Sequence, residues 1–144
     1  MTPQHGRPEP ARGMYEDEFW NFVQKSDLRL QRAASGRLRY PPAAVDPETL
    51  DPEYEWIPIQ GTGKLIAWTV FHRQYFPEFP TPYTVGAVQI DEGPILYANI
   101  IGVAPKQNLY HGMPMTVTYE PTASAGREWT IFQWRPTSSV ETEP

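Results

Sequence analysis

The sequence predicts a mainly β protein with an N-terminal helix, a small hairpin module and a five- to six-stranded barrel. Two observations lead to this fold class. Apolar side chains recur at helical spacing only once, in residues 15–27. From residue 53 onward, β-branched and aromatic runs follow one another, and glycines separate them at the short intervals that are typical of small barrels.

Length, charge and composition restrict the class of protein. The chain has 144 residues, which suffices for one ordinary domain with a small appendage. It has no cysteine, which excludes disulfides and thiolate metal sites and fits a reducing cytosol. Its 12 basic residues against 17 acidic ones disfavour nucleic-acid binding, which requires clustered Lys and Arg. Without a signal-peptide run or a stretch of ~20 apolar residues, we expect a cytoplasmic protein that does not contact membranes.

The first elements are a flexible tail and one amphipathic helix. Residues 1–14 are rich in Pro, Gly and Arg and show no periodicity, so a flexible tail is expected. The helix at 15–27 has acidic residues in its first turn, where the helix dipole favours them. Its aromatic face has two interpretations: it packs on the protein's own domain, or Phe19, Trp20 and Phe22 bind a partner chain.

A hairpin module follows, so that residues 15–52 form one unit of helix and hairpin. The segments LRLQR (28–32) and GRLRYPP (36–42) predict two short strands around a turn. A second turn follows in DPET, residues 46–49. We expect the Asp46 carboxylate to cap that turn by accepting a hydrogen bond from a backbone N–H.

Residues 53–136 are expected to form the barrel, and residues 137–144 a second flexible tail. Among small barrels, the OB-fold fits the number of strands and the length of this region. The predicted strands are EYEWIPIQ (53–60), KLIAWTVFHRQ (64–74), PYTVGAVQI (82–90), PILYANIIGV (94–103), MPMTVTYE (113–120) and EWTIFQW (128–134).

No catalytic residue is expected. Of the three histidines, His5 falls in the tail and His111 in a turn that leads into a strand. Glu78 could pair with His72, but the sequence does not establish that contact, and no relay of nucleophile, base and acid is evident. The paired carboxylates are adjacent in sequence, at a helix start and at a turn, which is unlike an acid/base pair. The GTGK segment at 61–64 lacks the spacing and the following Ser or Thr of a phosphate-binding loop.

An ordered set of segments then carries a family resemblance. They are FW (19–20), LRLQR (28–32), GRLRYPP (36–42), EW (55–56), GTGKLIAWTVFHR (61–73), PYTVGAVQIDEG (82–93) and HGMPMTVTYE (111–120). Over roughly residues 19–120 the chain resembles the thiolase-associated zinc-ribbon/OB-fold family, the acyl-CoA-associated domain of unknown function 35.

The resemblance also shows a departure at the zinc ligands. In the family, two C-x-x-C pairs bracket the GRLRYPP-like strand and hold zinc. Here these positions fall on residues 33–35 and on Asp46 and Thr49, which cannot complete a tetrahedral zinc site. We therefore expect a degenerate, metal-free zinc-ribbon-like hairpin that contains no zinc and packs on the barrel or a partner. Its candidate interface residues are Arg37, Arg39 and Tyr40.

The resemblance implies a non-catalytic accessory subunit of a thiolase-superfamily acyl-CoA enzyme, which is a thiolase, an acyltransferase or a retro-aldolase. The implied assembly is an α2β2 heterotetramer with a thiolase-like catalytic subunit. It has no tightly bound cofactor and takes a coenzyme A thioester as its substrate. The alternative is a free-standing OB-fold module that binds acyl-CoA, a lipid or, less favoured, nucleic acid through aromatic residues such as Trp68, Tyr97 and Trp134.

The loop from residue 72 to 83 has two corresponding interpretations. It packs over the barrel mouth, or it forms a rim that contacts the acyl chain or the pantetheine arm of the substrate. Its mixture of basic and aromatic side chains suits the second interpretation. The candidate residues facing acyl-CoA or the partner are His72, Arg73, Tyr75, Phe76, Phe79 and Tyr83.

Overall fold

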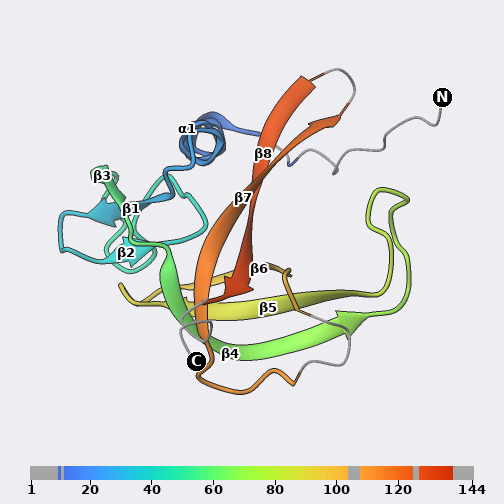
Figure 1. Cartoon of the computed structure of the whole chain (residues 1–144). Coiled ribbons are helices and arrows are strands. Elements are labelled where there is room, and N and C mark those ends of the chain that lie inside the picture. Colours follow the sequence, from blue (N-terminus) through green and yellow to red (C-terminus); the bar gives the residue numbers. More distant parts are fainter. Residues whose placement is uncertain (1–9, 11, 104–107, 125–126, 138–144) are drawn as a thin grey trace.

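The computed structural model describes residues 10, 12–103, 108–124 and 127–137. Within these residues, one helix, a three-stranded sheet and a closed five-stranded barrel form the protein (Figure 1). The mainly β prediction is confirmed. Most of the two predicted flexible tails lies outside the described residues, and the helix begins at Met14, inside the first of them.

Helix α1 spans Met14–Gln24. Glu16 and Asp17 lie in its first turn, and Phe19 and Val23 are its buried residues. It ends three residues before the predicted end because Ser26 adopts a left-handed conformation with φ 57°, which halts helical hydrogen bonding. No helix among the described residues has the length and apolar character needed to span a bilayer.

A small antiparallel sheet follows α1, with strand order β2-β1-β3. Its strands are β1 (Arg29–Ala33), β2 (Leu38–Arg39) and β3 (Tyr54–Pro58). We call residues 28–58 the ribbon. The predicted β1–β2 hairpin is confirmed, with Gln31 opposite Arg39.

The placement of β3 corrects the prediction. The segment at 53–60 was expected in the barrel, yet β3 pairs with β1 along its whole length, from Arg29 opposite Pro58 to Ala33 opposite Tyr54. Alternation predicts a half-buried strand but does not say which sheet it joins. The turn after Asp46 returns the chain to the free edge of β1, and this return decides the pairing.

The barrel closes in the order β4-β5-β6-β8-β7. Its strands are β4 (Thr62–Phe71), β5 (Tyr83–Ile90), β6 (Ile95–Ile100), β7 (Pro114–Ser124) and β8 (Arg127–Pro136). Each matches a predicted strand with shifted ends. The seam between β6 and β8 is short: Ile100 pairs with Trp134 in parallel, and the Ile101 N–H donates to the Trp134 carbonyl at 2.8 Å.

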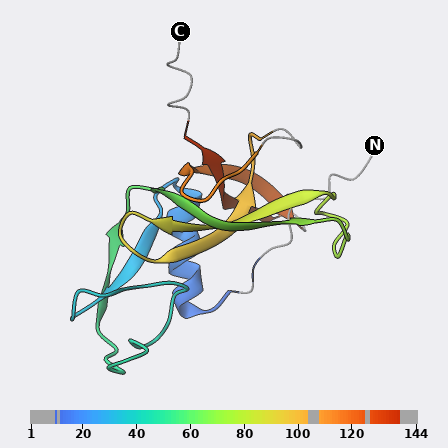
Figure 2. The ribbon, with the colours of Figure 1, turned by 90° about the horizontal axis from the view of Figure 1, so that it is seen from below.

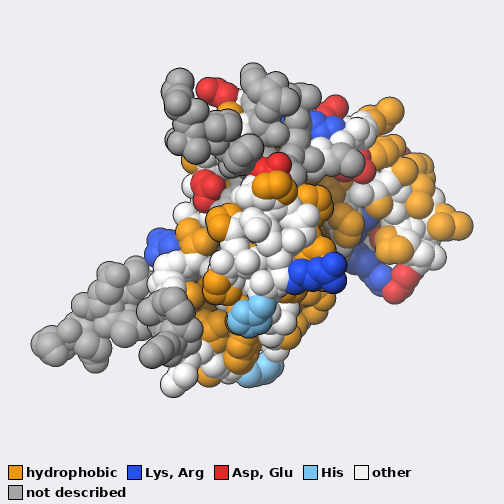
Figure 3. All heavy atoms as spheres, turned by 90° about the vertical axis from the view of Figure 1, so that its right-hand side faces the viewer, with side chains coloured by type: hydrophobic (Ala, Val, Ile, Leu, Met, Phe, Trp, Pro, Cys, Tyr) orange, Lys and Arg blue, Asp and Glu red, His pale blue; other side chains and the backbone are white. Residues whose placement is uncertain are grey.

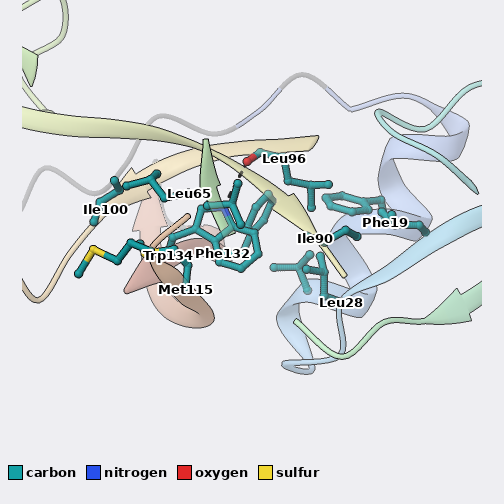
Figure 4. Close-up of a cluster of buried hydrophobic side chains, with 13 residues drawn as sticks. Phe19, Leu28, Leu65, Ile90, Leu96, Ile100, Met115, Phe132 and Trp134 are labelled. Carbon is teal, nitrogen blue, oxygen red and sulfur yellow. Dashed lines mark hydrogen bonds between the residues drawn. The ribbon is translucent and has the colours of Figure 1, made fainter. Parts of the chain in front are cut away.

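Trp134 lies at the centre of the barrel core (Figure 4). Its side chain is fully buried with Leu65, Leu96 and Met115, and its indole Nε1 donates to the Leu96 carbonyl at 3.3 Å. The expectation that Trp134 offers a surface for ligands is therefore wrong. Phe132 and Trp134, two residues apart on β8, both belong to the hydrophobic core cluster, as alternation along a strand requires for one face.

Helix α1 joins the ribbon to the barrel. Phe19 contacts Phe132 of β8, with ring centroids 6.1 Å apart, and Trp20 contacts Trp129 at 5.6 Å. On the ribbon side, the Trp56 indole N–H donates to the Glu18 carboxylate at 2.8 Å. Seen from below, the ribbon and the far end of the β4–β5 hairpin lie at opposite ends of the molecule (Figure 2).

Candidate functional site

A groove of about 730 Å³ lies beside the β4–β5 hairpin. Its walls come from three adjacent strands and from the segment that follows β6. The strand residues are Trp68, Val70, Tyr83, Thr84, Asn99 and Ile100. Figure 3 shows this end of the molecule, where hydrophobic side chains and histidine gather over the lower part of the face.

Strand register brings these side chains to one surface. Trp68 and Val70 are two residues apart, so they point to the same face of β4. Trp68 lies opposite Gly86, and Val70 lies opposite Thr84. A Cβ on Gly86 would lie 2.6 Å from the Cδ1 atom of Ile100, so only glycine allows the β6 side chain to approach here.

The structure brings two of the predicted loop residues into the groove wall, His72 and Tyr83. Two other loop residues, Phe79 and Phe76, form successive aromatic contacts that begin at Tyr83. Phe79 lies 5.6 Å from Tyr83 between ring centroids, and Phe76 lies 6.3 Å from Phe79. This arrangement supports the Tyr83 side of the groove with aromatic contacts.

Arg73 and Tyr75 do not line the groove. The Arg73 guanidinium lies over the Tyr75 ring, 5.2 Å from its centroid, and the Tyr75 side chain is 61% exposed. Phe76 is also exposed, at 52%. The loop therefore presents aromatic surface beyond the groove as well as inside it.

Sequence reasoning missed several residues of the wall. Val70 follows from alternation once Trp68 is placed in the groove, and that signal was available. Asn99, Ile101 and Leu109 belong to β6 and to the segment after it, and only the sheet order brings them next to β4 and β5. No local pattern in the sequence indicates this neighbourhood.

The groove has a mixed lining of apolar and polar side chains. Asn99, Asn108 and His72 supply hydrogen-bond donors and acceptors, while its described lining contains no Asp or Glu. A general base or nucleophile with an orienting acid is therefore missing from this wall. The groove can bind an apolar group and hydrogen-bond a carbonyl or hydroxyl at its edge.

The ribbon interior is polar where the resemblance expects a metal module. The Gln31 side chain is fully buried, and its Oε1 accepts hydrogen bonds from Arg39 Nε at 3.1 Å and from the Ala43 N–H at 2.8 Å. Arg39 Nη2 donates to the Ala43 carbonyl at 3.2 Å, and the guanidinium lies over the Tyr54 ring. These bonds fix the chain after the first turn.

The second turn is held by Asp46. Its buried Oδ1 accepts the N–H groups of Glu48 at 2.8 Å and Thr49 at 3.0 Å, so the predicted cap is confirmed. These two donors, Thr49 first, hold the pKa of the Asp46 carboxyl below its ordinary value. Glu48 in turn pairs with Arg37.

The donor set does not fit zinc. Among the described residues, no group of three or more His, Cys, Asp or Glu side chains is placed to hold a metal ion. Asp46 Oδ1 accepts two backbone N–H groups, and its buried Oδ2 has no hydrogen-bond partner. One carboxylate oxygen cannot form a zinc site, and Thr49 supplies no strong zinc ligand.

The predicted interface residues divide into two groups. Phe19 and Arg39 are 1% and 6% exposed and are covered by this chain itself, so their assignment to a partner surface is corrected. Phe19 belongs to the core cluster, and Arg39 is turned inward by Gln31. The remaining candidates are Trp20, Phe22, Arg37 and Tyr40. Arg37 is exposed, and the other three are half-buried. Burial raises the pKa of Tyr40 to about 12.

Comparisons with known proteins agree on one kind of domain. The family model described as "ChsH2, C-terminal OB-fold domain" matches residues 56–120. The solved structure of an Ltp2-ChsH2(DUF35) aldolase superposes with a TM-score of 0.77 and 29% identity, covering 89% of this chain and 98% of that chain.

Two curated relatives extend the similarity. A probable enoyl-CoA hydratase alpha subunit from Thermomonospora curvata is 31% identical over 138 residues, which cover 94% of this chain and 42% of that protein. A DUF35 domain-containing scaffold protein from Pyrococcus furiosus is 28% identical over 96 residues, covering 65% of this chain and 71% of that protein. The chain spans about two fifths of the length of the curated hydratase subunits that it matches.

Proposed function

We propose that the chain is a member of the DUF35 OB-fold family and that it is a non-catalytic accessory subunit of a thiolase-superfamily acyl-CoA enzyme. The observation that carries this proposal is the groove beside β4 and β5. Its wall combines apolar side chains with amides and a histidine, and its described lining has no acid that could complete a catalytic relay. Such a wall binds part of a substrate and leaves the reaction to groups from another subunit.

The names of the similar proteins support a role beside a catalytic subunit. They include a hydratase alpha subunit, a scaffold protein and a DUF35-containing aldolase. By analogy, the substrate of the assembly is a coenzyme A thioester, and this chain binds no cofactor tightly. Trp68, Val70 and Ile101 would contact the acyl group, and Asn99 and His72 would hydrogen-bond its polar end.

The finer features of the assembly are part of the same proposal. The partner is a thiolase-like subunit, and because such subunits form dimers by the family resemblance, two copies of this chain would bind symmetrically as α2β2. The ribbon works without zinc, since hydrogen bonds to Gln31 and Asp46 fix its two turns. A cytoplasmic location stays the prediction made from the sequence.

The test is to purify this chain, the thiolase-like subunit and the co-expressed pair, and to assay acyl-CoA cleavage and condensation. We expect no turnover by this chain alone and full activity only in the complex. Equal rates for the isolated partner and the complex would contradict the proposal, as would failure of the co-expressed chains to associate.

The contribution of the groove is tested with Trp68→Ala in the intact complex. We expect KM for the acyl-CoA substrate to rise about tenfold, because a large apolar contact is lost from the wall. Tyr97→Ala is the matched control: Tyr97 is an aromatic residue of β6 that is 66% exposed and does not line the groove. Equal KM values for the two variants would count against substrate contact at this wall.

A free-standing binding module remains the second candidate function. The groove favours it, because described residues of this chain alone form the wall. Tight binding of an acyl-CoA by the isolated chain, together with no association with a thiolase-like subunit, would select this alternative.

A further inference from the structure

In the outer part of β4, the sequence is typical of a buried strand, whereas the side chains are exposed. Residues 66–71 read IAWTVF and contain no charge, which is typical of a strand that is covered on both faces. In the structure, residues 67–70 are exposed one after another. Since successive side chains point to opposite faces, both faces of this segment are open, and Trp68 and Val70 are 40% and 42% exposed.

The same segment has a free hydrogen-bonding edge. Strand β4 pairs with β7 only over Thr62–Lys64, and the last backbone bonds on that side join Leu65 to residues 112 and 113. Beyond Leu65, the described neighbour of β4 is β5 alone. Within the part of the chain that the structure describes, nothing covers this edge, and residues 66–71 contain no charge or proline. Such an apolar edge is a ready site for another strand.

The pairing of β5 shows which groups of this edge are free. The Ile90 N–H donates toward β6, to Pro94, and the Asp91 N–H donates toward β4, to Thr62. Alternation along β5 therefore turns its odd-numbered residues toward β4. The residues opposite them, Ala67 and Thr69, bond to β5, because Ala67 pairs with Ala87 and Thr69 with Val85.

It follows that Trp68 and Val70 direct their N–H and C=O groups away from β5. They lie opposite Gly86 and Thr84, the β5 residues that face β6. Their side chains line the groove, while their backbone groups point to the open edge. The edge and the groove are thus parts of one continuous surface.

We propose that an extended segment of the catalytic partner pairs with residues 66–71 of β4 as an added strand. This inference rests on the proposed function and specifies how the two chains meet. At one end of this segment the edge is occupied, because Lys64 pairs with Pro114 of β7. At the other end, His72 and Arg73 follow the apolar residues. The added strand is therefore apolar along residues 66–71 and acidic where it passes Arg73, since opposite charges across a strand pair stabilise it.

A second copy of this chain is the alternative occupant of the edge. Protected Trp68 and Val70 amides in a dimer of the isolated chain would identify it.

Hydrogen–deuterium exchange tests the inference on the full chain, alone and in the co-expressed complex. In the free chain, we expect the amides of Trp68 and Val70 to exchange rapidly and that of Thr69 slowly. In the complex, the first two should slow at least about tenfold. A complex in which both still exchange rapidly would overturn this inference and leave the proposed function intact, whereas absence of a complex would overturn both.

Val70→Pro and Val70→Ala provide a second measurement. Proline removes the outward N–H without removing a bond to β5, and edge strands tolerate it. We expect Val70→Pro to bind the partner at least about tenfold more weakly than Val70→Ala, which keeps the N–H. Equal affinities would contradict strand addition, and so would protected Trp68 and Val70 amides in a dimer of the isolated chain.

Discussion

The ribbon and the barrel are both small antiparallel structures, but the side chains at their centres differ in kind. In the barrel, the fully buried groups include Trp134, Leu65 and Met115. In the ribbon, Gln31 and Asp46 are buried, with polar atoms bonded to the backbone of the two turns. The barrel is held mainly by removal of apolar surface from water, whereas the ribbon combines the buried Leu28 and Leu30 with specific hydrogen bonds at its turns.

This difference teaches how a ribbon without metal ligands keeps its shape. A module of this size buries too little apolar area to be stable by itself, and related modules add a metal. Here polar side chains fix the turns, and α1 and the barrel supply the apolar cover. Because Gln31 Oε1 and Asp46 Oδ1 each accept N–H groups of the ribbon, loss of either oxygen leaves its donors unsatisfied. The ribbon should therefore respond sharply to small chemical changes.

The largest effect is expected from Trp134→Ala, which removes the centre of the barrel core. Loss of a large buried aromatic side chain should lower the free energy of unfolding by about 3–5 kcal/mol. Urea denaturation measures this value, with Tyr97→Ala as an exposed aromatic control on β6. A loss below about 1 kcal/mol would show that the barrel does not depend on this core.

A smaller loss, of about 2–3 kcal/mol, is expected from Gln31→Leu. Leucine has a similar size but leaves Arg39 Nε and the Ala43 N–H without their acceptor inside the ribbon. The control is Gln31→Glu, whose carboxylate keeps an acceptor beside the Arg39 cation and should stay close to wild type. If leucine proved as stable as glutamine, the polar network would not be what holds the ribbon.

Acid should loosen the second turn through Asp46. Its pKa in the folded protein lies below the ordinary value of 3.8, so its stabilisation is complete above that value. The contribution is lost as the pH falls through the lowered pKa. The amide exchange of Thr49 measures this loss, and Asp46→Asn keeps an oxygen acceptor that does not titrate. Parallel pH profiles of wild type and Asp46→Asn would contradict the assignment.

The smallest effect is expected from zinc and from chelators. Neither should change the free energy of unfolding. The residues at the family ligand positions do not fit a zinc site, so removing metal should leave the urea midpoint unchanged. Elemental analysis of the purified chain provides the second measurement. A content near one zinc per chain, or a midpoint that falls with chelator, would break the contrast between ribbon and barrel.

The parts of the fold that local patterns determine were predictable. Runs of β-branched and aromatic residues between turns indicated every barrel strand, and the position of Asp46 before a proline indicated its cap. Strand pairing was harder to predict from the sequence. The β3 segment resembles a barrel strand, and only the path of the chain after Asp46 places it beside β1. Likewise, the loop suggested His72 and Tyr83, but Asn99 and Ile101 reach the groove through sheet order, which leaves no local signal.

The position of α1 has a consequence for the geometry of any assembly. Glu18 bonds to the ribbon through Trp56, while Trp20, two residues along, packs on Trp129 of the barrel. The helix therefore prevents the two regions from turning independently. Because the ribbon and the β4–β5 hairpin lie at opposite ends (Figures 1 and 2), the chain acts as a rigid spacer. Partners that bind to the ribbon and to the β4–β5 hairpin are therefore held at a fixed distance and orientation relative to each other.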